Sequence, residues 1–227
     1  MKRTKLRDRK LPDYTRGEEI FNMVSHIVGG GLGVIVLCTC LIKSALVGDG
    51  YDIAGSIVYG LSMIILYAMS SIYHGLKPEM GKKVFQVLDH CTIFGLIAGT
   101  YTPIALSVIR PMNPWLGWGL FALVWGVTAL GVTLNAIDLK RYTVLSMILY
   151  IVLGWCIIFT GDAAISALGM RGMTWILAGG ISYTIGAIFY GVAGHGKKPR
   201  RYIHSVFHLF VVVGSILQYV GIILYVI

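Results

Sequence analysis

Charged side chains are scarce in this chain. Asp, Glu, Lys and Arg make up 13% of the 227 residues, whereas hydrophobic residues make up 56%, and the mean hydropathy is +0.77. This balance lies outside the usual range of soluble globular domains. The short segments of alternating hydrophobicity that are typical of membrane β-barrels are also missing. The composition therefore indicates an integral membrane protein built from α-helices.

Cysteine is rare as well. All four cysteines lie inside apolar segments, where a thiol behaves as a small buried hydrophobic group. They are Cys38, Cys40, Cys91 and Cys156. We therefore expect no disulfide framework and no redox function.

Seven apolar segments are long enough to cross a bilayer as helices. They are Ile20–Leu46, Ile53–His74, Val87–Ile109, Trp115–Ala136, Val144–Thr160, Met173–Val192 and Ile203–Ile227. We expect an all-α membrane protein, a seven-transmembrane-helix bundle that forms one domain over residues 18–227 after a basic segment at residues 1–17. The first segment lacks a small-residue cleavage site, so we expect it to be retained rather than removed as a signal peptide.

Lys and Arg are distributed unevenly around these segments. Sixteen lie before the first segment or in the second, fourth and sixth loops, and three lie at the other ends. The positive-inside rule then predicts a cytoplasmic amino terminus and a carboxyl terminus outside. The net charge of +9 and the run "KKPRRY" at 197–202 fall in short loops beside the membrane. Anionic lipid headgroups are therefore the expected partners of these cations, and nucleic acid is not.

Glycines spaced four residues apart occur in two of the segments. Gly29 and Gly33 form one pair, and Gly95 and Gly99 form another. Small residues at this spacing let membrane helices approach closely, so we expect both pairs to serve packing.

Polar residues within the apolar segments gather at one depth. In the first segment they recur at intervals of three and four and so share one helical face. By the predicted topology, the polar residues of four helices all lie at the cytoplasmic ends of their segments. They are Glu19, Asn22, His26, Ser70, His74, Asp89, His204 and His208. Ionisable groups inside a membrane are unfavourable without a partner, so this convergence predicts a functional site.

The histidines of this group suggest a metal centre. His204 and His208 are one helical turn apart, a spacing that lets two imidazoles bind one ion, although such a pair can instead face lipid headgroups. His74 at the same depth supplies a third nitrogen, and three nitrogen donors with an open fourth position match a catalytic zinc site. Asp89 could hold a zinc-bound water or accept a hydrogen bond from a ligating imidazole.

Ser70 and His26 each admit more than one interpretation. Ser70 could bond its own backbone carbonyl four residues back, or it could polarise a substrate carbonyl or orient a water molecule. His26 could belong to the site, bond Glu19 or Asn22, or pack between helices.

The other two histidines are expected outside the site. His90 follows Asp89 directly, and the two side chains should not both point inward. His195 belongs to a loop.

Several other chemistries are excluded by missing residues. Six histidines are too few for a membrane di-iron oxygenase. The pair Glu18–Glu19 lacks the arginine expected in a CAAX-type protease, and no GxSxG motif occurs. The stretch "GVAGHGKK" resembles a phosphate-binding loop, but Lys198 replaces the Ser or Thr that would contact magnesium.

Together these motifs resemble the haemolysin III family, the bacterial branch of the progestin and adipoQ receptor family, within a wider group that includes alkaline ceramidases. The resemblance covers nearly the whole chain. It is carried by the spacing of Glu19, Asn22, Ser25 and His26, by "SSIYH" with Ser70 and His74, by "LDH" with Asp89, and by "HSVFH" with His204 and His208.

The resemblance implies a multi-pass protein of the bacterial cytoplasmic membrane with zinc near the cytoplasmic side. The zinc would be bound by His74, His204 and His208, with Asp89 associated with the metal-bound water. For eukaryotic relatives the resemblance also implies hydrolysis of lipid amides such as ceramides. The family name implies cytolysis, whereas these helices are those of a resident bundle.

We therefore expect a zinc-dependent hydrolase of a lipid amide or ester bond. Asp89 would be the general base and Ser70 would assist it, with Glu19, Asn22 and His26 as a supporting polar cluster. The alternative is a non-enzymatic, receptor-like regulator of membrane homeostasis in which zinc is structural. A membrane lipid would be the substrate in the first case and a ligand in the second.

Overall fold

The computed structural model describes residues 3–193 and 201–227, and within these ranges every regular element is helical. The long helices are α1 (Arg16–Val47), α2 (Gly50–Gly75), α3 (Met80–Pro103), α5 (Pro114–Gly154), α6 (Asp162–Ala193) and α7 (Ile203–Tyr225). The short elements are η1 (Leu6–Asp8), η2 (Ile104–Ile109), α4 (Arg110–Met112) and η3 (Cys156–Thr160). The prediction of an all-α chain with helices of membrane-spanning length is confirmed.

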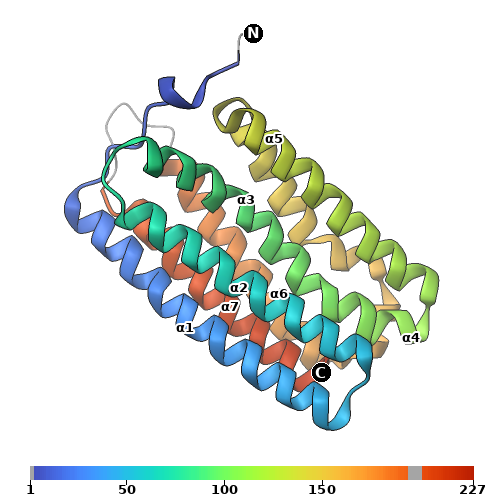
Figure 1. Ribbon diagram of the computed structural model, residues 1–227. Helices are drawn as coiled ribbons and strands as arrows, with labels where there is room; N and C mark the ends of the chain where they lie inside the picture. The colour runs from blue at the N-terminus through green and yellow to red at the C-terminus, as the bar shows by residue number, and fades with distance from the viewer. Residues whose placement is uncertain (1–2, 194–200) are drawn as a thin grey trace.

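The predicted seven segments are matched once α5 is divided in two. Asp138 has non-helical backbone angles (φ −159°, ψ 88°), and Figure 1 shows the chain turning back at the end of the bundle where α5 is labelled. The carboxylate of Asp138 accepts a hydrogen bond from the Arg141 backbone N–H at 3.2 Å, which begins the second half as a capped helix. The described residues thus contain six apolar helices that are long enough to cross a membrane, and α5 crosses the bundle twice.

Capping residues determine where the first two helices begin. Thr15 and Glu18 form a capping box at the start of α1, and Asp49 and Asp52 form another at the start of α2. In each box two side chains satisfy backbone N–H groups that have no partner within the helix. Both helices therefore begin on polar residues outside the apolar runs.

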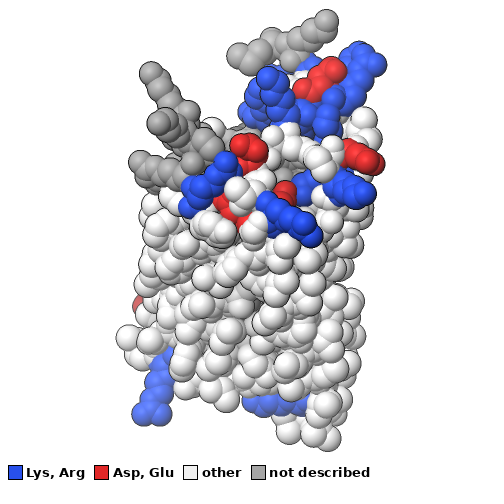
Figure 2. Space-filling model, turned by 90° about the vertical axis from the view of Figure 1, so that its left-hand side faces the viewer, with Lys and Arg blue, Asp and Glu red and all other residues white. Residues whose placement is uncertain are grey.

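The helices lie side by side so that four of their ends meet. The start of α1, the end of α2 and the starts of α3 and α7 lie together at the end of the bundle nearest the amino terminus (Figure 1). Figure 2 shows that Lys and Arg gather at this same end, above a broad belt that carries almost no charge. The polar residues predicted to share one depth are therefore on neighbouring helix ends.

Close approach of α1 and α2 depends on glycine. A Cβ atom added at Gly29 would lie 2.5 Å from ring atoms of Tyr67, and one at Gly33 would lie 3.1 Å from the Ile64 backbone. Gly99 similarly faces Ser62, whereas a Cβ atom at Gly95 would meet no atom within 4 Å. The predicted packing function is confirmed for three of the four glycines.

Replacement of Gly29 should loosen the contact between α1 and α2. We expect Gly29→Ala to lower stability by about 1–3 kcal/mol, because the added methyl group overlaps the Tyr67 ring. Gly31→Ala is the matched control, since its Cβ atom would meet nothing within 4 Å and the change in helix propensity is the same. Thermal denaturation of the purified variants measures the difference, and equal melting temperatures would contradict this packing.

Candidate metal centre

Three histidines from two helices converge at the end of the bundle where the basic residues gather. His74 lies in the last turn of α2, and His204 and His208 lie in the first turns of α7. All three are buried, and their ligand atoms lie within 4.8 Å of one another. The structure thus brings together the three residues that the sequence singled out as metal ligands.

The geometry of this triad can accommodate a metal ion. The Nε2 atoms of His204 and His208 are 3.1 Å apart, and the Nε2 atom of His74 is buried without a hydrogen-bond partner. Two nitrogens bound to one tetrahedral zinc ion at ~2.0–2.1 Å would lie about 3.3 Å apart. The spacing and the unpartnered nitrogen therefore fit a shared ion.

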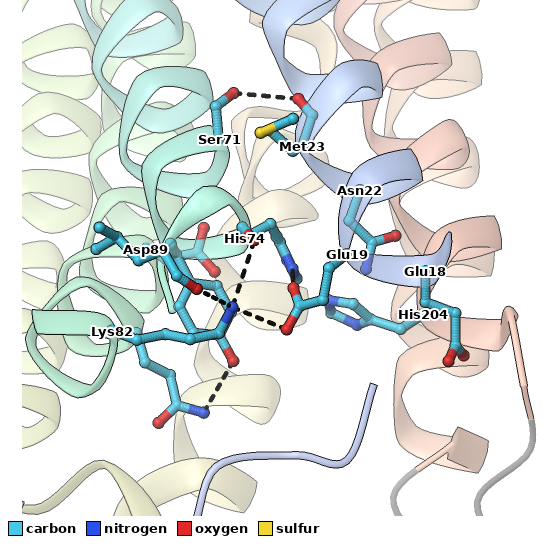
Figure 3. A network of polar contacts seen from close by, with 12 residues as sticks. Glu18, Glu19, Asn22, Met23, Ser71, His74, Lys82, Asp89 and His204 are labelled. Carbon is cyan, nitrogen blue, oxygen red and sulfur yellow. Dashed lines mark hydrogen bonds and ion pairs between the residues drawn. The ribbon is translucent and has the colours of Figure 1, made fainter. Parts of the chain in front are cut away.

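Glu19 orients His74 toward the other two histidines. Its Oε2 atom is 2.6 Å from Nδ1 of His74, and its Oε1 atom is 2.8 Å from Nζ of Lys82 (Figure 3). When Nδ1–H donates to the carboxylate, the lone pair of Nε2 is left free for a metal, as is common around metal-bound histidines. Sequence reasoning missed Lys82, which it counted only among the basic residues of a loop.

Glu18 positions the start of α7. Its Oε1 atom accepts a hydrogen bond from the backbone N–H of Tyr202 at 2.7 Å, two residues before His204. Tyr202 has a left-handed conformation (φ 60°, ψ 0°), and Arg201 lies 3.4 Å from the same carboxylate. Sequence reasoning had weighed Glu18 only as half of a protease motif.

His26 belongs to the centre through ring packing. Its ring stacks on His208 with centroids 3.8 Å apart and meets Tyr67 edge-on at 5.0 Å. Neither ring nitrogen of His26 has a hydrogen-bond partner, and the same holds for the side-chain atoms of Asn22. Of the three interpretations, hydrogen bonding of His26 to Glu19 or Asn22 is therefore wrong, and packing within the site is what the structure shows.

Ser70 and Asp89 line a cavity that begins at the histidines. This cavity is also lined by His26, His204 and His208. The Ser70 hydroxyl is buried and unpartnered, so the interpretation that it bonds its own helix is wrong. Its neighbour Ser71 does form that bond, to the Tyr67 carbonyl at 2.7 Å. The Ser70 hydroxyl is thus free to bond a bound molecule.

Asp89 is not one of the three clustered ligands. Among the described residues, the group whose ligand atoms lie within 4.8 Å contains the three histidines alone. The Asp89 carboxylate lies 3.9 Å from Nδ1 of His90 and reaches the same cavity. Asp89 therefore lies in the cavity wall and is not a fourth member of the cluster.

The expectation that Asp89 and His90 cannot both face inward is wrong. Both line the cavity, and His90 also bonds the Tyr190 hydroxyl through Nε2 at 3.1 Å. Successive helical residues point about 100° apart, so a wide cavity flanked by several helices can receive both. His195 lies outside the described residues.

The amino-terminal segment covers the centre on its polar side. The ring of Tyr14 stacks on His204 with centroids 5.0 Å apart and lies 5.8 Å from His74. Burial raises the pKa of the Tyr14 phenol well above its ordinary value, so the group stays neutral. Tyr14 belongs to the basic segment at residues 1–17, and no pattern in the sequence indicates that it packs against α7.

The walls of the cavity become apolar away from the histidines. Residues of α3, α5, α6 and α7 form these walls, among them Ile93, Leu96, Ile97 and Val211. A group of unpartnered polar atoms at one end and apolar walls beyond is the usual arrangement of a small-molecule site.

Comparison with known proteins places this architecture in one family. The family model described as "Haemolysin-III related" matches residues 14–219. Hemolysin-3 of Bacillus cereus is 35% identical over 209 residues, which cover 92% of each chain. The Hemolysin-3 homolog of Bacillus subtilis (strain 168) is 32% identical over 212 residues, covering 93% of this chain and 96% of the relative.

A more distant relative is a human protein. Monocyte to macrophage differentiation factor is 22% identical over 172 residues, covering 73% of this chain and 67% of the relative. The family match spans the helices that carry the histidine triad, and the two bacterial relatives align along nearly their whole length. The chain therefore belongs to the haemolysin III family.

Proposed function

We propose that this protein is a zinc-dependent membrane hydrolase that cleaves an amide or ester bond of a lipid. The observation that carries the proposal is that the histidine triad adjoins an apolar cavity, which two of its members, His204 and His208, line directly. Two further groups suited to hydrolysis, the Ser70 hydroxyl and the Asp89 carboxylate, line that same cavity. The alternative function is that of a regulator with a structural metal, and it is supported by the way the triad joins α2 to α7.

Zinc fits the donor set better than other ions. Among the described residues the cluster consists of three imidazoles without a carboxylate or thiolate, which matches the three-ligand sites of catalytic zinc. Imidazole also binds copper, iron and nickel, but zinc is a Lewis acid without redox chemistry and is the usual ion of such three-ligand hydrolytic sites. When bound, zinc lowers the pKa of a water molecule toward about 7 and polarises the scissile carbonyl.

The residues of the chain supply the remaining functions. Asp89, as general base, takes a proton from the attacking water and returns it to the nitrogen or oxygen of the leaving group. Ser70 donates a hydrogen bond from its unpartnered hydroxyl to the substrate carbonyl as negative charge develops there. Glu19 holds His74 in place, and Lys82 balances the charge of Glu19.

The surroundings suit a lipid substrate. Apolar walls accept the acyl chain, and the polar end of the cavity receives the bond to be cleaved. The Lys and Arg side chains at that end of the molecule (Figure 2) would contact anionic headgroups. Because the two relatives that align along nearly their whole length are bacterial and the basic residues collect at one end, we assign the protein to the bacterial cytoplasmic membrane with that end inside.

Loss of either α7 ligand should remove the metal. Purified protein should carry close to one zinc per chain, and His204→Ala or His208→Ala should lose most of it, because two imidazoles alone bind zinc weakly. His90→Ala, a cavity histidine outside the triad, should retain it. Elemental analysis by mass spectrometry measures the ratio, and full zinc content in both α7 variants would contradict the assignment.

Lipid hydrolysis should depend on Ser70 and Asp89, whereas zinc binding should not. We expect Ser70→Ala to reduce lipid hydrolysis about 10²–10³-fold and Asp89→Asn about 10²–10⁴-fold. Both should keep their zinc and their fold. Ser71→Ala is the matched control, since that hydroxyl bonds its own helix. Release of fatty acid from lipid amides and esters in reconstituted vesicles measures the rate.

If the metal is structural, the same variants should give different results. Asp89→Asn would then lower zinc content and melting temperature together, Ser70→Ala would change little, and no lipid would change in amount in vesicles or cells. That combination would replace the hydrolase proposal by the regulatory one.

Orientation in the membrane can be tested at both ends of the bundle. A cysteine replacing exposed Lys77, in a chain with Cys38 replaced by serine, should react with an impermeant reagent only from the cytoplasm. A cysteine replacing Gly50, at the opposite end of α2, should react only from outside. A reporter fused after Ile227 should also be active outside, and labelling of both cysteines from one side would refute the orientation.

A further inference from the structure

The cavity extends far beyond the histidines. On α7 it is lined by His204 at one end and by Gln218 at the other, fourteen residues along the helix. At 1.5 Å per residue this separation is about 21 Å. On α6, Tyr190 and Ile176 line the cavity and are also fourteen residues apart. Two helices therefore give the same length, which exceeds the roughly 15 Å hydrocarbon depth of a single leaflet.

Unpartnered polar atoms occur at both ends of this cavity. At one end are the ring nitrogens and the hydroxyl of the metal centre. At the other end is Gln218, which is 7% exposed. Its Nε2 atom donates to the Ile176 carbonyl at 3.0 Å, while its Oε1 atom has no donor. A buried acceptor without a partner is uncommon in native proteins and indicates a missing ligand or water.

The polar groups between the two ends are already paired. Trp155 donates to Thr184 at 3.0 Å, Tyr101 donates to the Gly154 carbonyl at 2.9 Å, and Tyr183 bonds Ser215 at 2.8 Å. A buried water normally needs two to four polar partners, and among the described side chains that line this end of the cavity the unpartnered polar atom is Oε1 of Gln218. A hydroxyl group at the end of a bound acyl chain is held in place by that acyl chain, so a single acceptor is enough for it.

Glycine keeps the passage to Gln218 open. Gly180 and Gly154 both line the cavity, and a Cβ atom added at either would meet no atom within 4 Å. Gly180 lies one turn from Ile176 on α6, and its carbonyl accepts from Thr184. Larger residues at these two positions would therefore project into the space between the metal centre and Gln218.

We propose that the end of the cavity beyond Gly180 is a subsite for the far end of a long acyl chain, where Gln218 accepts a hydrogen bond from a hydroxyl group on that end. The inference rests on the proposed function, because it places the head of the same lipid at the histidines. It narrows the substrate class to long-chain lipids and favours chains that are hydroxylated near their end.

Binding of free fatty acids to the zinc-loaded, full-length protein tests the hydroxyl. Hexadecanoic acid and its ω-hydroxy derivative should compete for the site against a fluorescent fatty acid in nanodiscs. Wild-type protein should bind the hydroxy acid about three- to tenfold more tightly. Gln218→Leu should lose this preference and still bind hexadecanoic acid, since leucine has no acceptor. Gln218→Met is the second variant if Gln218→Leu does not fold.

A side chain at position 180 tests the passage. Gly180→Leu should weaken binding of hexadecanoic acid at least tenfold and leave the affinity for octanoic acid unchanged, because the shorter acyl chain ends before it reaches position 180. Gly126→Leu is the matched control: its Cβ atom also meets no atom within 4 Å, and it does not line the cavity. Gly154→Leu repeats the test from α5 if Gly180→Leu is unstable.

Each outcome bears on the proposal. Equal affinity of wild-type protein for the two acids would overturn the assignment of Gln218. Undiminished binding of hexadecanoic acid by both Gly180→Leu and Gly154→Leu would overturn the subsite. These measurements involve no turnover, so absence of hydrolysis with the binding preferences intact would instead refute the proposed enzyme and leave a lipid-binding cavity.

Discussion

The bond between the Glu19 carboxylate and the His74 imidazole is the interaction on which the site depends. It joins α1 to α2 at 2.6 Å, and the second oxygen of Glu19 extends the connection to Lys82 on α3 at 2.8 Å. A lone carboxylate at this depth would be strongly unfavourable, and the lysine offsets its charge. The outcome is a fixed imidazole whose second nitrogen faces α7, where His204 and His208 complete the triad.

The neighbouring acid performs a parallel task on the other side of the triad. The Glu18 carboxylate accepts hydrogen bonds from the backbone N–H groups of Thr15, at the cap of α1, and of Tyr202, at the start of α7. Two adjacent glutamates therefore position the two helices that carry the histidines. Adjacent residues on a helix diverge by about 100°, which is why one can reach α2 while the other reaches α7. The centre is thus held by residues that α1 contributes, although α1 supplies no member of the triad.

Bilayer constraints explain why the polar atoms of this protein are informative. Within the hydrocarbon region most hydroxyl groups bond their own helix or a neighbour, as Thr100, Thr102 and Ser71 do. Against that background, the unpartnered atoms of Ser70, His26 and Gln218 stand out, and all three residues line one cavity. Other buried hydroxyls, such as those of Tyr59 and Ser107, are also unpartnered but do not line this cavity. An unpartnered polar atom therefore indicates a site only where a cavity adjoins it.

The helical class, the approximate spans and the three histidines of the triad could all be predicted from the sequence. Run length and hydropathy suffice for spans because a backbone in lipid must satisfy its hydrogen bonds within each helix, and i, i+4 spacing places His204 and His208 on one face. Three contacts became known only from the packed helices: Glu19 bonds His74, His90 faces the cavity beside Asp89, and Tyr14 packs on His204. Those contacts join residues far apart in the chain or depend on how wide a space the neighbouring helices enclose. The long-range contacts and the width of that space follow from how whole helices rotate and pack, which local sequence patterns do not encode.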